Sequence, residues 1–209
     1  MSLAGLFLIT FLLVHLGLNL TLLFDKSRVP FNIAAHFMAT NLLIKVFEVV
    51  LFGGILIHIF WGIKLFFENR AARPQQYYVS NNSQQSVFSK YMIHTGVVIF
   101  SFLILHLMDF WFKAKFIGGM PTTLIDGREY EDMGLLVVEK FKSPIFASIY
   151  VGFLFLLGFH LDHAFQSALQ SIGLNHSKYT PFFKVFSRIL AIVISIGFIA
   201  IPVVVYFTF

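Results

Sequence analysis

The stretch "ILIHIFWGIKLFF" at residues 55–67 places one histidine, His58, inside a long apolar run. The same arrangement recurs at His15 in "FLLVHLGLNL", at His106 in "FLILHLMDFW" and at His160 in "FLLGFHLDHAF". A neutral imidazole buried in hydrocarbon needs a partner for its nitrogens, because leaving them unpaired costs free energy. Four such rings in a chain that keeps nearly all its charges outside its apolar runs therefore indicate a function for the histidines.

The composition places the chain in a membrane. It is 58% hydrophobic and 12% charged, with 28 phenylalanines in 209 residues, whereas about a quarter of the residues of a soluble domain are charged. Cysteine is absent, which excludes disulfides, thiolate metal sites and a cysteine-held iron–sulfur cluster within this chain. The net charge of +5 does not indicate nucleic-acid binding, because the basic residues stand singly at the ends of apolar runs.

Five apolar runs reach the length of about 20 residues that crosses a bilayer. The first run lacks a basic leading segment and is too long for a signal peptide, so we interpret it as a span. We predict an all-α fold, a five-helix transmembrane bundle that forms a single domain over residues 1–209. The predicted spans are approximately residues 2–24, 43–67, 91–112, 145–169 and 186–208.

The loops between these spans differ in charge. Lysine and arginine are in excess in 64–90 and 170–188, whereas acidic residues balance the basic ones in 113–143. The loop at 25–45 is mildly basic and weakens the contrast. Because cytoplasmic loops are enriched in positive charge, we predict a cytoplasmic N-terminus and an external C-terminus.

The four histidines fall at two depths in this topology. At 1.5 Å per residue, His15 and His106 lie about 15 and 10 Å from the outer edge of their spans, and His58 and His160 lie about 20 and 27 Å from it. One pair is therefore predicted toward the outside and the other toward the inside, with each pair drawn from two helices. Two imidazoles that face each other at one depth are what a six-coordinate haem iron requires.

Glycines near His58 fit the same interpretation. Gly54 and Gly62 stand four residues before and after it, on its own helix face, where a flat macrocycle could approach the backbone. The alternatives are that such histidines pack or hydrogen-bond within the bundle, that the glycines serve helix packing, and that the histidines relay protons in a transporter without haem.

Five motifs carry a resemblance to a known family. They are "LLVHLGLN" around His15, "AAHFM" around His36, "LIHIFWG" around His58, "TGVVIFSFLILH" ending at His106, and "FHLDHAFQSALQSIGL" beginning beside His160. The similarity covers all five predicted spans, and the chain resembles the dihaem, single-polypeptide cytochrome b membrane anchor of succinate dehydrogenases and fumarate reductases.

This resemblance implies a function, cofactors and partners. His58 and His160 would ligate an inner haem b near an iron–sulfur subunit, and His15 and His106 an outer haem b. A flavoprotein subunit and that iron–sulfur subunit would oxidise succinate on the cytoplasmic face of a bacterial cytoplasmic membrane. The chain itself has no G-x-G-x-x-G motif for binding flavin and would pass electrons to a quinone in the lipid, menaquinone by the same resemblance.

The remaining polar residues have narrower interpretations. His36 is a candidate for the quinone region, and Glu48 either serves quinone-linked protonation or pairs with Lys45. Some fumarate reductases carry a glutamate two residues before the fourth-helix ligand for a proton path, but Gly158 stands there in this chain. The alternative function is the haem-b anchor of another respiratory complex, such as a hydrogenase or a formate dehydrogenase. Three further histidines are interpreted as structural: His94, His163 and His176.

Overall fold

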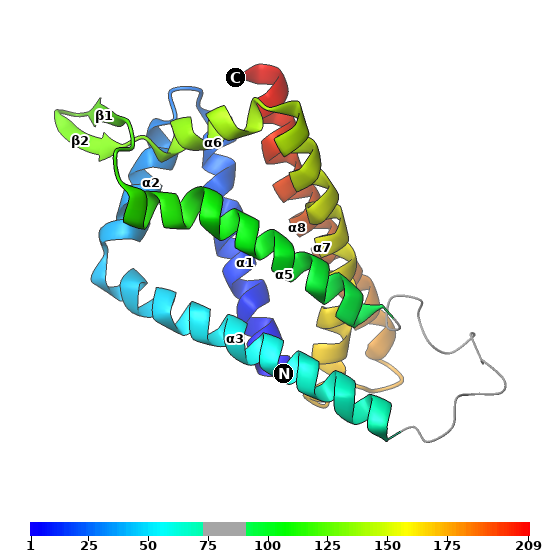
Figure 1. Cartoon of the computed structure of the whole chain (residues 1–209). Helices are drawn as coiled ribbons and strands as arrows, with labels where there is room; N and C mark the ends of the chain where they lie inside the picture. Colours follow the sequence, from blue (N-terminus) through cyan, green and yellow to red (C-terminus); the bar gives the residue numbers. More distant parts are fainter. Residues whose placement is uncertain (73–90) are drawn as a thin grey trace.

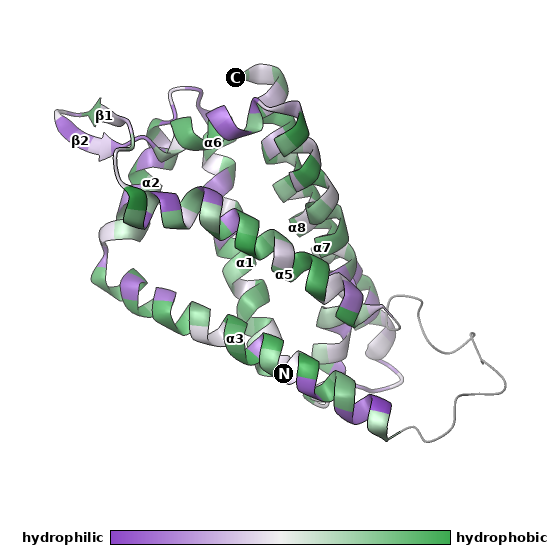
Figure 2. Cartoon of the chain, in the orientation of Figure 1, coloured by the Kyte–Doolittle hydropathy of each residue, from purple (hydrophilic) through white to green (hydrophobic). Residues whose placement is uncertain are grey.

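The computed structural model describes residues 1–72 and 91–209. Within them, five helices are long and apolar enough to cross a membrane (Figure 1). They are α1 (Ser2–Phe24), α3 (Leu42–Ala71), α5 (Met92–His106) continued by the π-helix η1 (Leu107–Ile117), α7 (Pro144–Ser171) and α8 (Thr180–Thr208). Figure 2 shows hydrophobic residues along most of each helix. The predicted helical fold with five candidate spans is confirmed, and the helices extend beyond several of the predicted bounds.

Polar side chains begin two of these helices. The Asn41 side chain accepts hydrogen bonds from the backbone N–H groups of Leu43 and Ile44 at the start of α3. The Ser143 side chain accepts one from Phe146 at the start of α7, whose first residue is Pro144. Such caps satisfy N–H groups that have no partner within the helix, and proline fits the first helical position because it has no N–H.

Helices α1, α7 and α8 form the most tightly packed part of the molecule. The antiparallel α7 and α8 lie side by side in Figure 1, and α1 packs against both. A Cβ atom added at Gly158 would lie 2.9 Å from the Ser195 hydroxyl oxygen, and one added at Gly197 would lie 2.8 Å from a Leu16 methyl group. These glycines let the helices approach closely, as small residues do in membrane bundles. No space remains at Gly158 for a glutamate side chain.

Helices α3 and α5 pack differently. Neither contains a buried residue, although together they carry two of the four candidate histidines, His58 and His106. In α8, by contrast, Ile194 and Val205 are almost fully buried. The protein atoms alone therefore leave α3 and α5 on the periphery of the α1–α7–α8 core.

The connections at the C-terminal end of the bundle are folded, which corrects the prediction of plain loops at 25–45 and 113–143. They contain α2 (Val29–Thr40), strands β1 (Thr122–Ile125) and β2 (Arg128–Glu131), and α6 (Met133–Phe141). The strands form an antiparallel hairpin whose turn residues, Asp126 and Gly127, have φ angles of 49° and 75°. Asp-Gly is a preferred pair for a two-residue turn with positive φ angles, and the twist of such a turn matches that of the paired strands.

A buried carboxylate joins α2 to α6. Asp132 is 4% exposed, accepts hydrogen bonds from Arg28 Nη2 and Asn32 Nδ2, each at 2.8 Å, and caps the N-H of Leu135. Burial raises the pKa of Asp132, but the hydrogen bonds from Arg28 and Asn32 lower it by a larger amount. The pKa therefore lies below its ordinary value. The Asn32 side-chain oxygen in turn accepts a hydrogen bond from the backbone N–H of Gly134. We call Arg28, Asn32 and Asp132 the α2–α6 clasp.

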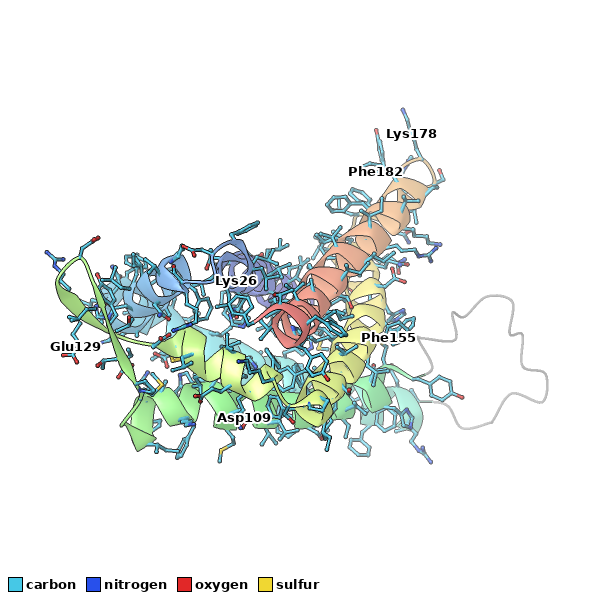
Figure 3. The ribbon with its side chains drawn as sticks, turned by 90° about the horizontal axis from the view of Figure 1, so that it is seen from above. Lys26, Asp109, Glu129, Phe155, Lys178 and Phe182 are labelled. Carbon is cyan, nitrogen blue, oxygen red and sulfur yellow. The ribbon has the colours of Figure 1, made fainter. Side chains whose placement is uncertain are left out.

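The two ends of the bundle thus differ in structure. In Figure 3, Glu129 on the hairpin and Lys178 before α8 lie at opposite extremities of the molecule. The Lys26 ammonium group donates a hydrogen bond to the backbone oxygen of Thr208 at 2.8 Å, so the end of α1 and the C-terminus lie at the hairpin end. The other end carries the start of α1, the end of α3 and the α7–α8 turn (Figure 1).

Candidate functional site: two facing histidine pairs

The four candidate histidines form two pairs of facing rings. The rings of His58 on α3 and His160 on α7 have centroids 6.4 Å apart and planes inclined at 72°. The rings of His15 on α1 and His106 at the end of α5 have centroids 5.8 Å apart and planes inclined at 87°. The structure therefore brings together the same histidines that the depth estimate paired, while haem binding by them stays a prediction.

Two glycines show how far apart the pairs lie. A Cβ atom added at Gly5 on α1 would lie 3.8 Å from His58 Cε1, and one added at Gly96 on α5 would lie 3.8 Å from His160 Cε1. Gly5 precedes His15 by ten residues, and Gly96 precedes His106 by ten. At 1.5 Å per residue, each helix separates the two levels by about 15 Å. We call the level of His58 and His160 the inner level and that of His15 and His106 the outer level.

Neighbouring side chains orient several of these rings. The Thr95 hydroxyl lies 3.1 Å from His160 Nδ1, a contact that fixes the plane of the imidazole. The His15 ring stacks on Phe11 with centroids 5.3 Å apart and also contacts Phe198. A hydrogen bond to the second ring nitrogen is typical of histidines that bind metals, because it sets the direction of the coordinating nitrogen.

Three buried polar atoms in the described ranges have no hydrogen-bond partner. They are Nδ1 of His58, Nδ1 of His106 and the hydroxyl of Tyr150. A buried donor or acceptor left unpaired costs about 1–3 kcal/mol, and such atoms in a native protein require an explanation. Two of the three belong to candidate ligands, one at each level.

The donor set fits haem better than a bare metal ion. No group of three or more histidine, cysteine, aspartate or glutamate side chains that could hold a metal ion occurs in residues 1–72 and 91–209. Each level instead offers two imidazoles from two different helices. With metal–nitrogen bonds of about 2 Å, two imidazoles bound to one iron have ring centres about 6 Å apart, in agreement with the observed 5.8 and 6.4 Å. The macrocycle of haem supplies the remaining iron ligands.

The glycines predicted to contact haem face α1. A Cβ atom added at Gly54 would lie 3.1 Å from the Phe7 ring, and one added at Gly62 would lie 3.5 Å from the terminal methyl group of Met1. These contacts give both glycines a place in the packing of α3 on α1, and their contact with haem stays a prediction. Sequence reasoning missed Gly5, Gly96 and Thr95, although the Thr-Gly pair stands within one of the motifs quoted above.

Glu48 has partners that the sequence did not indicate. Its carboxylate accepts hydrogen bonds from Lys115 Nζ at 2.5 Å and from Trp111 Nε1 at 2.6 Å. The ion pair therefore joins α3 to η1, and Glu48 pairs with Lys115 instead of Lys45, whose pairing was one of its two interpretations. Its service in quinone-linked protonation stays a prediction. Glu48 precedes His58 by ten residues, which places it near the outer level.

The other polar candidates belong to neither pair. His36 is exposed on α2, with its ring 4.8 Å from that of Tyr130 on β2. His163 is half-buried on α7, and His94 and His176 are exposed. The structural role of His94, His163 and His176 and the role of His36 toward a quinone stay predictions.

Comparisons with known proteins add no family to this description. No protein-family model, curated protein or solved structure matches the chain. Its functional interpretation therefore depends on its own residues and their geometry.

Proposed function

We propose that the chain is a dihaem cytochrome b that anchors a succinate:quinone oxidoreductase in the membrane and transfers electrons between its iron–sulfur subunit and a quinone. The observation that carries this proposal is the pair of facing imidazoles at each of two levels, contributed by four different helices. Isolated packing histidines have no reason to meet in two pairs at the spacing of axial haem ligands.

The proposed ligands are His58 and His160 at the inner level and His15 and His106 at the outer level. Bound haem b supplies reversible one-electron transfer. The protein's part is to hold each imidazole neutral and correctly oriented in an apolar environment. Thr95 orients His160, and Gly5 and Gly96 leave the rings of the inner level free to approach their neighbours.

The two ends of the bundle have separate proposed roles. The end that carries Lys64, Arg70, Lys178 and Lys184 would face the cytoplasm by the positive-inside rule and dock the iron–sulfur and flavoprotein subunits. The hairpin end would then be external. Glu48, tied to Lys115, and His36 belong to that end, where we propose that the quinone, menaquinone by the resemblance, exchanges electrons and protons.

The test is the haem content of the chain purified with its native partners. We expect two haems b per chain by the pyridine haemochrome assay and low-spin spectra in the oxidised and reduced states. One haem or none would contradict the proposal. Mass identification of the co-purified subunits separates it from the anchor of a hydrogenase or formate dehydrogenase, whose partners would be different proteins.

A further inference from the structure

Tyr150 on α7 has a buried hydroxyl that the protein leaves without a partner. The residue is 4% exposed, and its hydroxyl is one of the three unpaired buried polar atoms in the described parts of the chain. The other two belong to His58 and His106. Removing a phenol hydroxyl from water without a hydrogen bond is unfavourable. The Tyr150 hydroxyl therefore requires a hydrogen-bond acceptor that the described part of the chain does not supply.

The hydroxyl belongs to the outer level. Tyr150 precedes His160 by ten residues on α7, a rise of about 15 Å, which equals the separation of the two levels measured along α1 and α5. Its ring contacts that of His106 directly, with centroids 6.3 Å apart and planes inclined at 52°. The two unpaired atoms at the outer level, His106 Nδ1 and the Tyr150 hydroxyl, are thus on touching side chains from different helices.

Aromatic rings hold Tyr150 in place. Four phenylalanine rings have their centroids 4.8–6.2 Å from its ring and belong to α5, η1, α6 and α7. None of them can accept a conventional hydrogen bond, so they fix the phenol without pairing its hydroxyl. The four are Phe102, Phe110, Phe141 and Phe146.

Beyond these four rings lie two charged side chains, Lys140 and Asp109, which form an ion pair with each other. Lys140 Nζ lies 4.9 Å from the centroid of the Phe146 ring and 2.5 Å from Asp109 Oδ1. Figure 3 shows Asp109 beside α6, the helix that carries Lys140. Asp109 is thus held by Lys140, and no hydrogen bond joins its carboxylate to the Tyr150 hydroxyl.

We infer that Tyr150 donates a hydrogen bond to an acceptor oxygen at the edge of the group held by His15 and His106, namely a carboxylate of haem. This inference rests on the proposed function. The hydrogen bond withdraws negative charge from the edge of the macrocycle and thereby favours the reduced iron, which carries one more electron. Tyr150 therefore raises the reduction potential of the outer haem relative to a site without the hydroxyl.

The test is the Tyr150→Phe variant of the complete complex. The matched control is Tyr206→Phe, because the Tyr206 side chain near the end of α8 is exposed. Spectroscopic redox titration gives the midpoint potentials of the two haems, and the spectra of His15→Ala and His58→Ala identify which is which. We expect the outer potential of Tyr150→Phe to fall by about 60 mV, a tenfold change in a one-electron equilibrium. The inner potential and both potentials of Tyr206→Phe should stay at their wild-type values.

The outcomes separate this inference from the function on which it rests. Two haems with unchanged potentials in Tyr150→Phe, or an equal shift of both, would overturn the role of Tyr150 and leave the dihaem proposal standing. A wild-type complex without haem would overturn both.

Discussion

At His160, two consecutive residues of the neighbouring helix α5 fix the position of the imidazole ring. Thr95 lies within hydrogen-bond distance of Nδ1, and Gly96 leaves the space into which the ring edge fits. A hydroxyl on one nitrogen leaves the other nitrogen free, so the contact selects which atom of the imidazole can coordinate. His160 is in this respect the most preorganised of the four histidines.

Removal of the Thr95 hydroxyl tests this preorganisation. In Thr95→Val the His160 ring keeps its packing but loses its orienting hydrogen bond, and we expect about tenfold weaker haem binding at the inner level. Haem titration of the haem-depleted protein measures the affinity. Thr10→Val is the control, because the Thr10 hydroxyl only donates to the backbone oxygen of Leu6 within α1. Equal affinities in wild type and Thr95→Val would contradict the orienting role.

Loss of either inner histidine should damage the same haem. We expect His58→Ala and His160→Ala to lose the inner haem or convert it to high spin, and to keep the low-spin signal of the outer haem. Because the two side chains share one iron on the proposed function, the double variant should match either single variant in its optical and electron paramagnetic resonance spectra. His163→Ala is the control and should retain both haems. If His58→Ala and His15→Ala affected the same haem, the assigned pairs would be wrong.

At the scale of single elements, the α2–α6 clasp makes the stability of the hairpin end depend on pH. The pKa of Asp132 is raised by burial but lowered more by the hydrogen bonds from Arg28 and Asn32, and the net shift is downward. Its stabilising contribution is therefore complete above the unfolded-state pKa of about 4 and is lost as pH falls through the lower folded-state pKa.

The prediction for this clasp concerns Asp132→Asn. At pH 7 the variant should be about 2 kcal/mol less stable, the size of hydrogen bonds to a charged group, and its stability should change less than that of wild type below pH 4. Thermal unfolding of the solubilised protein at a series of pH values measures both effects. Asp126→Asn at the exposed hairpin turn should follow the wild-type curve, and a wild-type curve as flat as that of Asp132→Asn would exclude the clasp as the cause.

The elements that the sequence predicts are those whose signal is local. The five long helices follow from runs of apolar residues alone. The hairpin also has a local signal, since Asp126-Gly127 stands between short strands that begin with Thr122 and Arg128. The hairpin was therefore predictable from the sequence, although only a loop was predicted there. Helix α6 is only nine residues long, and its apolar residues are buried against other elements, which periodicity in one sequence cannot specify.

The site is predictable only to the level of its histidines. Depth along a span follows from counting residues, so His15 can be paired with His106 without a structure. The contacts of Gly5 with His58 and of Glu48 with Lys115 join residues from different helices, and their formation depends on how the helices cross. The π-helical turn that begins directly after His106 likewise has no local signal in the sequence.

At the scale of the whole molecule, orientation in the membrane decides which histidine pair faces the soluble partners. A reporter fused after Ala72, at the end of α3, should behave as cytoplasmic, and one inserted at Gly127, in the hairpin turn, as external. Alkaline phosphatase and green fluorescent protein fusions report the two sides. The reverse pattern would exchange the inner and outer levels and contradict the proposed direction of electron transfer.

The four candidate histidines are divided equally between the first and second halves of the chain. The helices that carry the first two histidines are α1 and α3, and those that carry the other two are α5 and α7. Each facing pair therefore combines one histidine from each half.

The consequence concerns biosynthesis. A nascent chain that ends after α3 already carries two of the four candidate ligands, His15 and His58, but they lie about 15 Å apart along the bundle and belong to different pairs. On the proposed function, neither haem could gain its second histidine until the later helices have been translated and inserted. Haem binding would therefore report that synthesis of the chain is complete. Each bound haem would also link the first half of the chain to the second, because a ligand that binds only the assembled state stabilises it.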